Sequence, residues 1–346
     1  MSNPIRQLME EKEARELAPE AVRSFQTRGR ERPEPECPIR TAFQRDRDRI
    51  LHSKSFRRLK HKTQVFLSPE GDHYRTRLTH TLEVTQIART ISRALRLNED
   101  LTEAIGLGHD LGHTPFGHAG EAILNEIVPG GFRHYEQSLR VVEKLEADGN
   151  GLNLTWEVRD GILKHSKGAG AVFTEQDRGR PGTLEGQVVR VSDIIAYVNH
   201  DLDDAIRSGF IQAADVPAEV TEVLGDSHSK RINTLVTDVI HSSLNAGLLS
   251  VTMSPSVLKG MLDLRQFLYQ SVYALSIPKQ EFLKAKKILN DLYYFLVENE
   301  ELFLSKPRQS GDSVEQTATD FAAGMTDRFA INLYGKLFLP QSWHLF

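Results

Sequence analysis

The sequence has very little cysteine and no long run of apolar residues. Its single cysteine, Cys37, excludes an intrachain disulfide and a zinc site built from several thiolates. No apolar stretch approaches the roughly 20 residues that a membrane-spanning helix needs. Residues 1–20 are rich in charge and lack the apolar centre of a secretory signal. These absences favour the reducing cytosol, so we expect a cytoplasmic location and no membrane partner.

A strong excess of charge of one sign is also missing. The formal net charge is −4, and 26% of the residues are charged, which describes an ordinary solvated surface and leaves room only for a local basic patch. Strand-like alternation of apolar and polar residues is scarce. Apolar residues instead recur at helical spacing, for example along residues 188–206. We therefore predict an all-α protein.

Proline and charge divide the chain into three predicted segments. Residues 1–38 combine charged residues with three prolines and are expected to form a partly ordered N-terminal arm. Residues 39–210 carry apolar stripes at helical spacing and the candidate site residues described below, so they form the expected core. Residues 211–346 are predicted to be a helical C-terminal region that packs on this core and offers an oligomer interface.

Local composition predicts four shorter features. A Gly-rich polar loop is expected at residues 167–186, and a second polar loop at residues 306–319 precedes a last helix at about 320–338. The basic run at residues 54–62 has apolar positions at helical spacing and is interpreted as an amphipathic helix.

Histidine is concentrated in one part of the chain, since seven of the thirteen lie within residues 52–118. The strongest feature there is the dipeptide His109-Asp110, preceded by His80 on an earlier helical stripe and followed much later by Asp193. A lone His-Asp pair is usually a core histidine beside a helix-end carboxylate, but four such residues on helices suit a divalent ion. We predict these four residues as metal ligands that leave positions open for water and phosphate oxygens.

The order His, His-Asp, Asp on helices resembles the pattern of the HD superfamily of metal-dependent phosphohydrolases. The run from His109 to Glu121, His-Asp-Leu-Gly-His-Thr-Pro-Phe-Gly-His-Ala-Gly-Glu, is more specific and resembles the deoxyguanosine triphosphate triphosphohydrolase branch. Further similar segments are residues 44–50, 54–66, 76–83, 133–140, 193–204 and 324–330. The resemblance implies an HD-domain helical core with additional C-terminal helices. It also implies hydrolysis of deoxynucleoside triphosphates to deoxynucleoside and tripolyphosphate.

Four residues beyond the metal ligands are candidates for catalysis. His118 and Glu121 lie three positions apart, so a helix places both on one face, where the carboxylate can orient and charge the imidazole. Such a pair suits a general acid that protonates the leaving 5′ oxygen. The resemblance assigns both positions to catalysis and places His134 near the nucleophile or phosphate. His113 lies in a turn flanked by glycines and is interpreted as a phosphate contact.

Five residues are candidates for substrate binding. Asp193, Tyr197 and Asp201 recur every four residues, so a helix points all three into one cleft. By resemblance, Tyr197 would pack on the deoxyribose and exclude a 2′-hydroxyl, while Asp201 and Gln64 would hydrogen-bond the 3′-hydroxyl. Arg77 and Arg58 are the expected phosphate-contacting arginines, because guanidinium offers planar paired donors.

Several properties stay open at this level. An HD-type nucleoside monophosphate phosphatase and a non-catalytic regulator that binds nucleotide or nucleic acid are the alternative functions. The rest of the basic run suits an activating deoxynucleoside triphosphate or single-stranded nucleic acid. Mg or Mn is the expected metal in use, although the ligand set also accepts Fe, Ni, Co or Zn. The resembled family is commonly homo-oligomeric, and no motif selecting a base is recognised.

Overall fold

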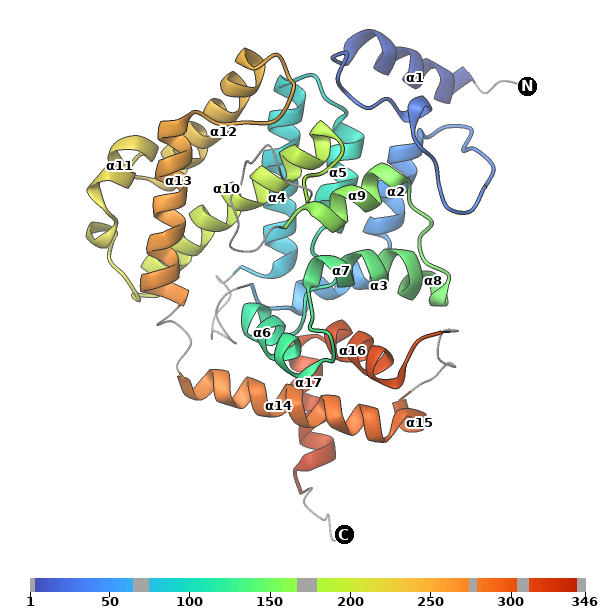
Figure 1. The fold of residues 1–346 in the computed structure, drawn as a ribbon, viewed down its shortest axis with the longest axis vertical. Coiled ribbons are helices and arrows are strands. Elements are labelled where there is room, and N and C mark those ends of the chain that lie inside the picture. The colour runs from blue at the N-terminus through green and yellow to red at the C-terminus, as the bar shows by residue number, and fades with distance from the viewer. Residues whose placement is uncertain (1–3, 65–74, 167–178, 274–278, 304–310, 341–346) are drawn as a thin grey trace, which may run out of the picture.

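The fold is built around three helices that cross at the centre of the molecule. The computed structural model of the chain describes residues 4–64, 75–166, 179–273, 279–303 and 311–340. The central helices, shown in Figure 1, are α4 (Arg77–Ala94), α5 (Glu99–Gly108) and α10 (Leu184–Arg207). The N-terminal end of the chain lies near the top of this view and the C-terminal end at the bottom.

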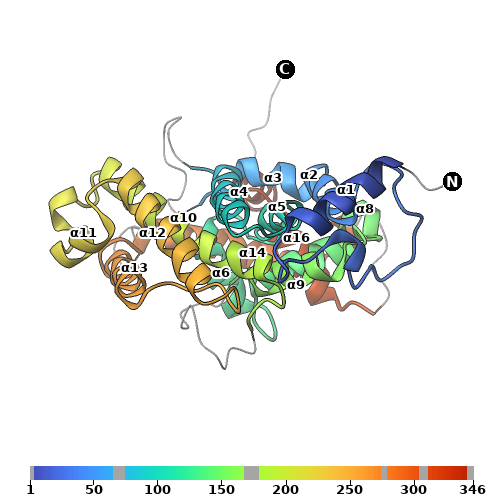
Figure 2. The same ribbon diagram turned by 90° about the horizontal axis from the view of Figure 1, so that it is seen from above.

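The other helices form groups around this centre. Helices α2 (Ala42–Leu51) and α9 (Trp156–Lys164) contact α5, and the short α3 (Lys54–Arg58) contacts α2. On one side, seen in Figures 1 and 2, lie α11 (Ala218–Leu224), α12 (His228–Asn245) and α13 (Pro255–Leu268). Below the centre in Figure 1 lie α6 (Gly117–Ile127), α14 (Lys279–Glu298), α15 (Glu300–Phe303), α16 (Val314–Gly324) and α17 (Asp327–Phe338). The remaining helices are α1 (Pro4–Glu16), α7 (His134–Arg140) and α8 (Glu146–Gly149).

Capping residues begin each of the three central helices. The side chains of Thr76, Asn98 and Thr183 each accept a hydrogen bond from the backbone N–H three residues further on, which satisfies one of the free donors at a helix start. Asn98 is followed by two acidic residues that complement the helix dipole. These caps therefore fix the residues at which the three central helices begin.

Apolar side chains gather in two separate clusters. The first joins the central helices to α2, α9 and α11 to α13, with fully buried residues such as Ile91, Ile105 and Val191. The second joins Phe116, α6 and Phe132 to α14, α16 and α17. The segment that begins with Phe116 therefore packs with the C-terminal helices rather than with the central three.

The prediction of an all-α protein is confirmed. The described residues contain no strand, only two isolated bridges, between Arg30 and Thr155 and between Thr63 and Thr76. None of the helices in these residues is both long enough and apolar enough to cross a membrane.

Two predicted helices are broken in the structure. The last helix, predicted at about 320–338, is instead the pair α16 and α17, because Met325 is extended and Thr326 starts a new helix by capping Phe329. The loop expected at 306–319 therefore ends at Ser313, the cap of α16, and its first part lies outside the described residues. Residues 54–62 form the short α3 followed by a 3₁₀ turn rather than one amphipathic helix.

The boundaries of the other irregular segments also differ from expectation. The loop expected at 167–186 lies outside the described residues up to 178, and α10 already begins at Leu184. The expected arm contains helix α1 and a segment that buried carboxylates hold against the core. Glu185 accepts the backbone N–H of Val22, and Glu157 accepts that of Arg28. Burial of these acceptors could not be read from the charged composition of the arm.

Candidate active site

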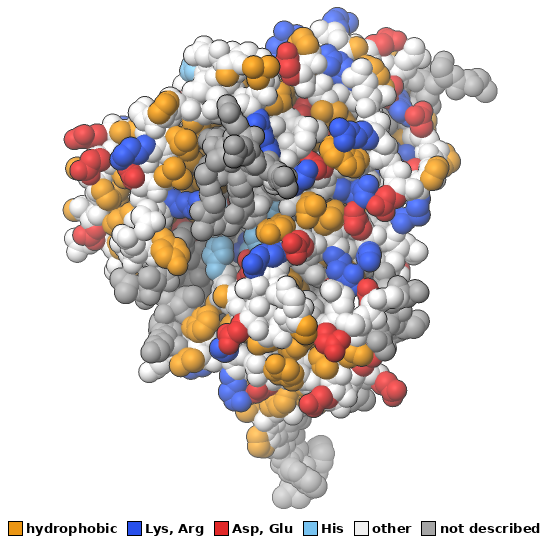
Figure 3. All heavy atoms as spheres, in the orientation of Figure 1, with side chains coloured by type: hydrophobic (Ala, Val, Ile, Leu, Met, Phe, Trp, Pro, Cys, Tyr) orange, Lys and Arg blue, Asp and Glu red, His pale blue; other side chains and the backbone are white. Residues whose placement is uncertain are grey.

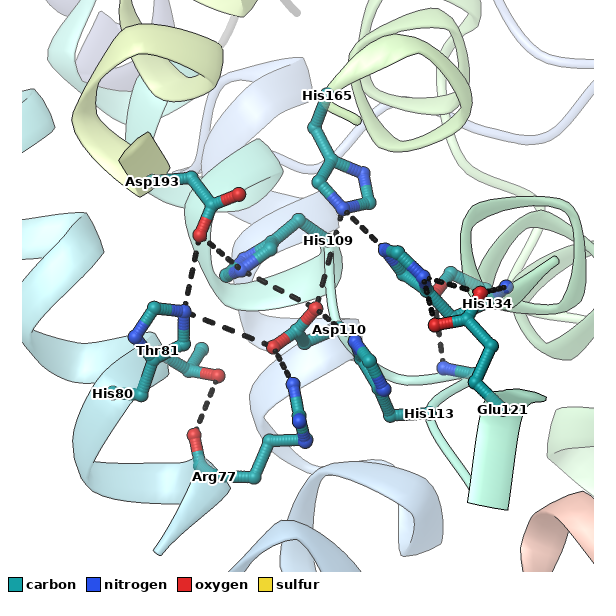
Figure 4. Close-up of polar contacts among 12 residues, drawn as sticks. Arg77, His80, Thr81, His109, Asp110, His113, Glu121, His134, His165 and Asp193 are labelled. Atoms are coloured by element: carbon teal, nitrogen blue, oxygen red, sulfur yellow. Dashed lines mark hydrogen bonds and ion pairs between the residues drawn. The ribbon is translucent and has the colours of Figure 1, made fainter. Parts of the chain in front are cut away.

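The four predicted metal ligands lie together where the three central helices meet. His80 comes from the first turn of α4, His109 and Asp110 directly follow α5, and Asp193 comes from the middle of α10 (Figure 4). The Nε2 atom of His80 is 3.1 Å from Asp193 Oδ1, and that of His109 is 3.5 Å from Asp110 Oδ1 and 3.9 Å from Asp193 Oδ1. His80, His109 and Asp110 each offer a ligand atom within 4.8 Å of the others.

The hydrogen bonding of His109 fits a bound cation. Its Nδ1 lies 2.7 Å from the carbonyl oxygen of Gly106. Because a carbonyl can only accept, Nδ1 carries the hydrogen and Nε2 is left with a lone pair. Nε2 is buried and has no hydrogen-bond partner among the described residues, although it points to where the other ligands gather. A divalent ion would supply the missing partner, and the carbonyl would orient the ring in the way usual for metal-binding histidines.

The charge of Asp110 also suits a cation. Burial by itself would raise the pKa of this carboxyl, but the neighbouring charges of His109, His113 and Arg77 hold it well below its usual range. Arg77 Nη1 donates to Asp110 Oδ2 at 2.7 Å, and both side chains are buried. The predicted phosphate-contacting arginine is thus located beside a predicted metal ligand. Its contact with phosphate stays a prediction.

A second cluster lies on the other side of Asp110 and consists of Glu121, His134 and His165 (Figure 4). The Glu121 carboxylate accepts hydrogen bonds from His134 Nδ1 at 2.9 and 3.0 Å and from the His134 backbone N–H at 3.0 Å. The Nε2 atoms of His134 and His165 are 3.2 Å apart. His165 Nδ1 lies 2.7 Å from the carbonyl of Ile162, so it too carries a hydrogen.

These contacts determine where a proton lies. Both Nδ1 atoms donate, so the two facing Nε2 atoms need one further proton between them. Burial lowers the pKa of His134, but the charge and hydrogen bonds of Glu121 outweigh it and the net shift is upward. Burial and the nearby charges of His109 and His134 lower the pKa of His165 to about 3. His134 is therefore the protonated ring, held between the carboxylate and the neutral His165.

These contacts add His134 as a hydrogen-bond partner of Glu121, and the expected pairing of Glu121 with His118 stays a prediction. His118 is exposed to solvent. Desolvation and the charge of Arg77 lower the pKa of His118 to about 4, against an opposing effect of the Glu121 charge. Accessibility together with strong desolvation is what a residue in a hollow experiences. Figure 3 shows histidine side chains in such a hollow on this face.

His113 links the two clusters. Its ring stacks on that of His134 with a centroid distance of 4.1 Å, and its Nε2 lies 3.3 Å from Asp110 Oδ1. Asp110, His113 and His134 form a second group whose ligand atoms lie within 4.8 Å of one another. The turn around His113 was predicted to let backbone approach a ligand. In the structure Gly112 approaches helix α7, and Gly117, at a φ of 58°, approaches the carbonyl of Gln64. The contact of His113 with phosphate stays a prediction.

The substrate-binding candidates surround this centre. Asp193, Tyr197 and Asp201 all lie on α10, as their spacing predicted. Burial raises the pKa of the Tyr197 hydroxyl against the opposing charge of Arg265 on α13. Gln64 is buried, and its Oε1 has no hydrogen-bond partner among the described residues. A buried acceptor of this kind suits a hydrogen bond from a ligand. The roles of these residues stay predictions.

Arg58 and two residues that sequence reasoning missed complete the description. Arg58 is exposed and donates to the carbonyl of Gly324 at 3.2 Å. Its contact with phosphate stays a prediction. His165 was missed because it stands alone in the sequence. A recognisable signal was its position directly after a helix, which it shares with His109, since both rings bond the carbonyl three residues earlier. Arg265 lies far from the histidine-rich segment and gave no signal.

The contact between Gly112 and α7 allows a direct test of this geometry. A Cβ atom at Gly112 would lie 2.2 Å from the backbone N of Ser138 and 2.4 Å from the backbone carbon of Gln137. We expect Gly112→Ala to push α7 from the His109-Asp110 turn and to destabilise the protein by about 1–3 kcal/mol. Urea unfolding followed by circular dichroism measures this change.

The matched control is Gly335→Ala in α17, where an added Cβ meets nothing within 4 Å. Because alanine is favoured over glycine inside a helix, this variant should gain up to about 1 kcal/mol. Equal stability of both variants would contradict the close approach of the two segments.

The fold and the site define the class of the protein. Residues 77–198 match the family model described as HD domain, and residues 251–336 match that described as phosphohydrolase-associated domain. The first range begins with α4 and ends within α10, so it spans all four predicted ligands. The chain is an HD-domain phosphohydrolase, and its His and Asp cluster suits a divalent metal ion.

Its relatives identify the branch. Proteins named deoxyguanosinetriphosphate triphosphohydrolase-like are 55% identical in Caldanaerobacter subterraneus subsp. tengcongensis, covering 98% of this chain and 97% of the relative, and 54% identical in Desulfatibacillum aliphaticivorans, covering 97% and 98%. A protein of the same name in Clostridium tetani is 47% identical and covers 97% of both chains. The chain therefore belongs to the HD-domain family of deoxyguanosinetriphosphate triphosphohydrolase-like proteins.

Proposed function

We propose that the protein hydrolyses deoxynucleoside triphosphates to deoxynucleoside and intact tripolyphosphate, with Mg or Mn in use at His80, His109, Asp110 and Asp193. The observation that carries this proposal is the acid–base cluster of Glu121, His134 and His165 on the far side of Asp110 from these ligands. A bound divalent ion would act as a Lewis acid toward phosphoryl oxygens and lower the pKa of a bound water. The printed names of the relatives support the substrate class.

The chain's own residues account for the charge and the proton. His134, protonated between Glu121 and His165, brings positive charge to the place where a phosphate would enter. His118 would protonate the leaving 5′ oxygen. At a pKa of about 4 it is neutral at pH 7 in the free protein. The negative charge of a bound triphosphate would raise this pKa, so substrate itself would prepare the acid.

Recognition of the sugar would follow from α10. Tyr197 would pack on the deoxyribose, and Asp201 with Gln64 would hydrogen-bond the 3′-hydroxyl. The buried Oε1 of Gln64, which lacks a partner among the described residues, supports this role, because a site with such groups binds poorly to a sugar that leaves them unpaired. Homo-oligomerisation, an activating deoxynucleoside triphosphate and a cytoplasmic location belong to the same proposal.

Product analysis tests the proposal. The purified protein is incubated with each deoxynucleoside triphosphate, singly and mixed, with Mg or Mn, and the products are separated by chromatography. Deoxynucleoside plus tripolyphosphate is the expected result, with His109→Ala as the blank. Turnover only in mixtures would identify an activating nucleotide. Monophosphate plus pyrophosphate, hydrolysis of nucleoside monophosphates alone, or bound metal without turnover would overturn the proposal and favour a phosphatase or a non-catalytic regulator.

A further inference from the structure

The predicted metal ligands and two of the acid–base residues, His118 and Glu121, belong to different parts of the packing. His80, His109 and Asp193 lie on or directly after helices of the first apolar cluster. His118 and Glu121 lie on α6, which packs in the second cluster with α14, α16 and α17. The C-terminal helices therefore support one half of the candidate active site and leave the other half to the central helices.

Polar contacts from the junction of α16 and α17 reach the turn that carries His113. Asp327 Oδ1 accepts the backbone N–H of Phe116 at 3.0 Å. Phe116 has a φ of 65°, in the left-handed region that residues with a Cβ rarely adopt. Asp327 Oδ2 accepts both the backbone N–H and the hydroxyl of Thr63, the neighbour of Gln64. A single buried carboxylate thus holds two segments of the site.

Lys62 makes a second bridge between the same parts. Its side chain is buried, and its amino group donates to the carbonyl of His113 and, at 2.8 Å, to the carbonyl of Ala323 near the end of α16. Burial and the charges of Arg58 and Arg77 lower the pKa of the Lys62 amine to about 7, against the opposing charges of Asp327 and Asp110. A buried amino group that donates to two carbonyls ties the His113 turn directly to α16.

The third link reaches α7, which begins with His134. Arg140, at the end of α7, donates to Asp320 of α16 through Nε at 2.8 and 2.9 Å and through Nη2 at 2.7 Å. Gln137 donates to the same carboxylate at 2.9 Å. A guanidinium held this way by one carboxylate has a fixed orientation as well as a fixed distance. Helix α7 is therefore held at its far end by the same C-terminal helix.

We propose that Asp327, Lys62 and Asp320 are positioning residues through which α16 and α17 set the geometry of the acid–base half of the site, independently of the metal ligands. None of the three is expected to touch substrate. They hold in place the backbone that carries His113, His118 and His134. The inference rests on the proposed function for the roles of those histidines, whereas the mechanical link rests on the contacts alone.

The primary test is Asp327→Asn, with Asp291→Asn as the matched control. The asparagine keeps the shape but turns a donor toward the donors of Phe116 or Thr63. Asp291 lies on α14, where it pairs with Lys287 and accepts a hydrogen bond from the Tyr334 hydroxyl of α17, so this control shows whether any weakened contact to α17 has the same effect. Hydrogen exchange with mass spectrometry should show faster exchange of a peptide covering residues 113–118 in Asp327→Asn only. Bound metal, measured by elemental analysis, should stay at the wild-type level.

Two substrates separate positioning from general damage. With a deoxynucleoside triphosphate, whose alkoxide leaving group needs a proton, kcat should fall about 10²-fold, as expected for a small displacement of catalytic groups. With bis(4-nitrophenyl) phosphate, whose leaving group needs no protonation, kcat should change little. Equal loss on both substrates, loss of metal, or unchanged exchange at residues 113–118 would overturn the proposal.

Two further outcomes are distinguishable. If wild-type protein does not cleave triphosphates, the proposed function fails, while exchange and metal content still decide whether the link exists. If Asp327→Asn does not fold, Asp320→Asn tests the α7 link, with faster exchange expected at residues 134–140 and metal retained. Exchange in that variant equal to wild type would overturn the proposal.

Discussion

Asp110→Asn should lose bound metal and turnover together and should also destabilise the metal-free protein. The carboxylate is shared, because one oxygen faces His109 and His113 while the other accepts from Arg77 at 2.7 Å. Removing its charge weakens metal binding, and loss of a catalytic metal worth several kcal/mol lowers kcat by about 10³-fold or more. It also leaves the buried Arg77 without its counter-charge, which costs about 3–5 kcal/mol.

His109→Ala separates these two effects. It removes one predicted metal ligand but keeps the ion pair between Arg77 and Asp110. Metal and turnover should therefore be lost, while the metal-free protein should lose less stability than in Asp110→Asn. Elemental analysis measures the metal, product analysis measures turnover, and urea unfolding of chelator-treated protein measures stability. Equal stability of the two metal-free variants would contradict a structural role for the Arg77 ion pair.

Part of the candidate site could be predicted because it follows from local order in the sequence. His109 and Asp110 are adjacent, and a helix that carries Asp193, Tyr197 and Asp201 at intervals of four must present them on one face. The all-α class followed in the same way from apolar spacing over long stretches. These inferences need only the period of a helix, which the sequence displays directly.

The hydrogen bonds between Glu121 and His134 could not be found in this way. Helical spacing offers His118, three residues away, whereas the structure brings His134, thirteen residues away, to the carboxylate. The connection between α6 and α7 contains Gly130 and Gly131 with φ of 85° and 83°, and such a turn sets a direction that periodicity cannot display. The bridges from Lys62 and Asp327 span more than two hundred residues of sequence for the same reason.

Breaks within helices were missed for a related physical reason. Residues 320–338 carry continuous apolar spacing, yet Thr326 caps a new helix and Met325 becomes extended. Tertiary contacts of the junction with Thr63 and Phe116 accompany this break. A capping threonine inside a periodic stretch is a weak local signal, and it is decisive only when long-range partners stabilise the interruption.

Glu121→Gln should lower kcat by about 10²-fold while bound metal is retained, since loss of an acid–base partner costs roughly this much. The reason is its effect on His134. Removing the carboxylate charge should lower the pKa of His134, so less of this ring is protonated at pH 7. Nuclear magnetic resonance titration of the histidine ring protons measures this pKa. An unchanged pKa of His134 would contradict the hydrogen bonds in the structure.

The pair should also make stability depend on pH with a definite sign. The pKa of His134 is raised from 6.5, so its contribution is complete below that value and is lost as pH rises through the raised pKa. The pKa of Glu121 is lowered from 4.5, so its contribution is complete above that value and is lost as pH falls through the lowered pKa. The stability lost in Glu121→Gln should therefore be largest between pH 4.5 and 6.5.

A double-mutant cycle decides which histidine Glu121 serves. If it acts through His134, then adding Glu121→Gln to His134→Gln should cost little further activity, because residues that act as a unit are not additive. Adding it to His118→Gln should instead multiply the two losses. The reverse pattern would restore the partnership that the sequence spacing suggested. It would mean that the carboxylate moves from His134 to His118 when substrate binds.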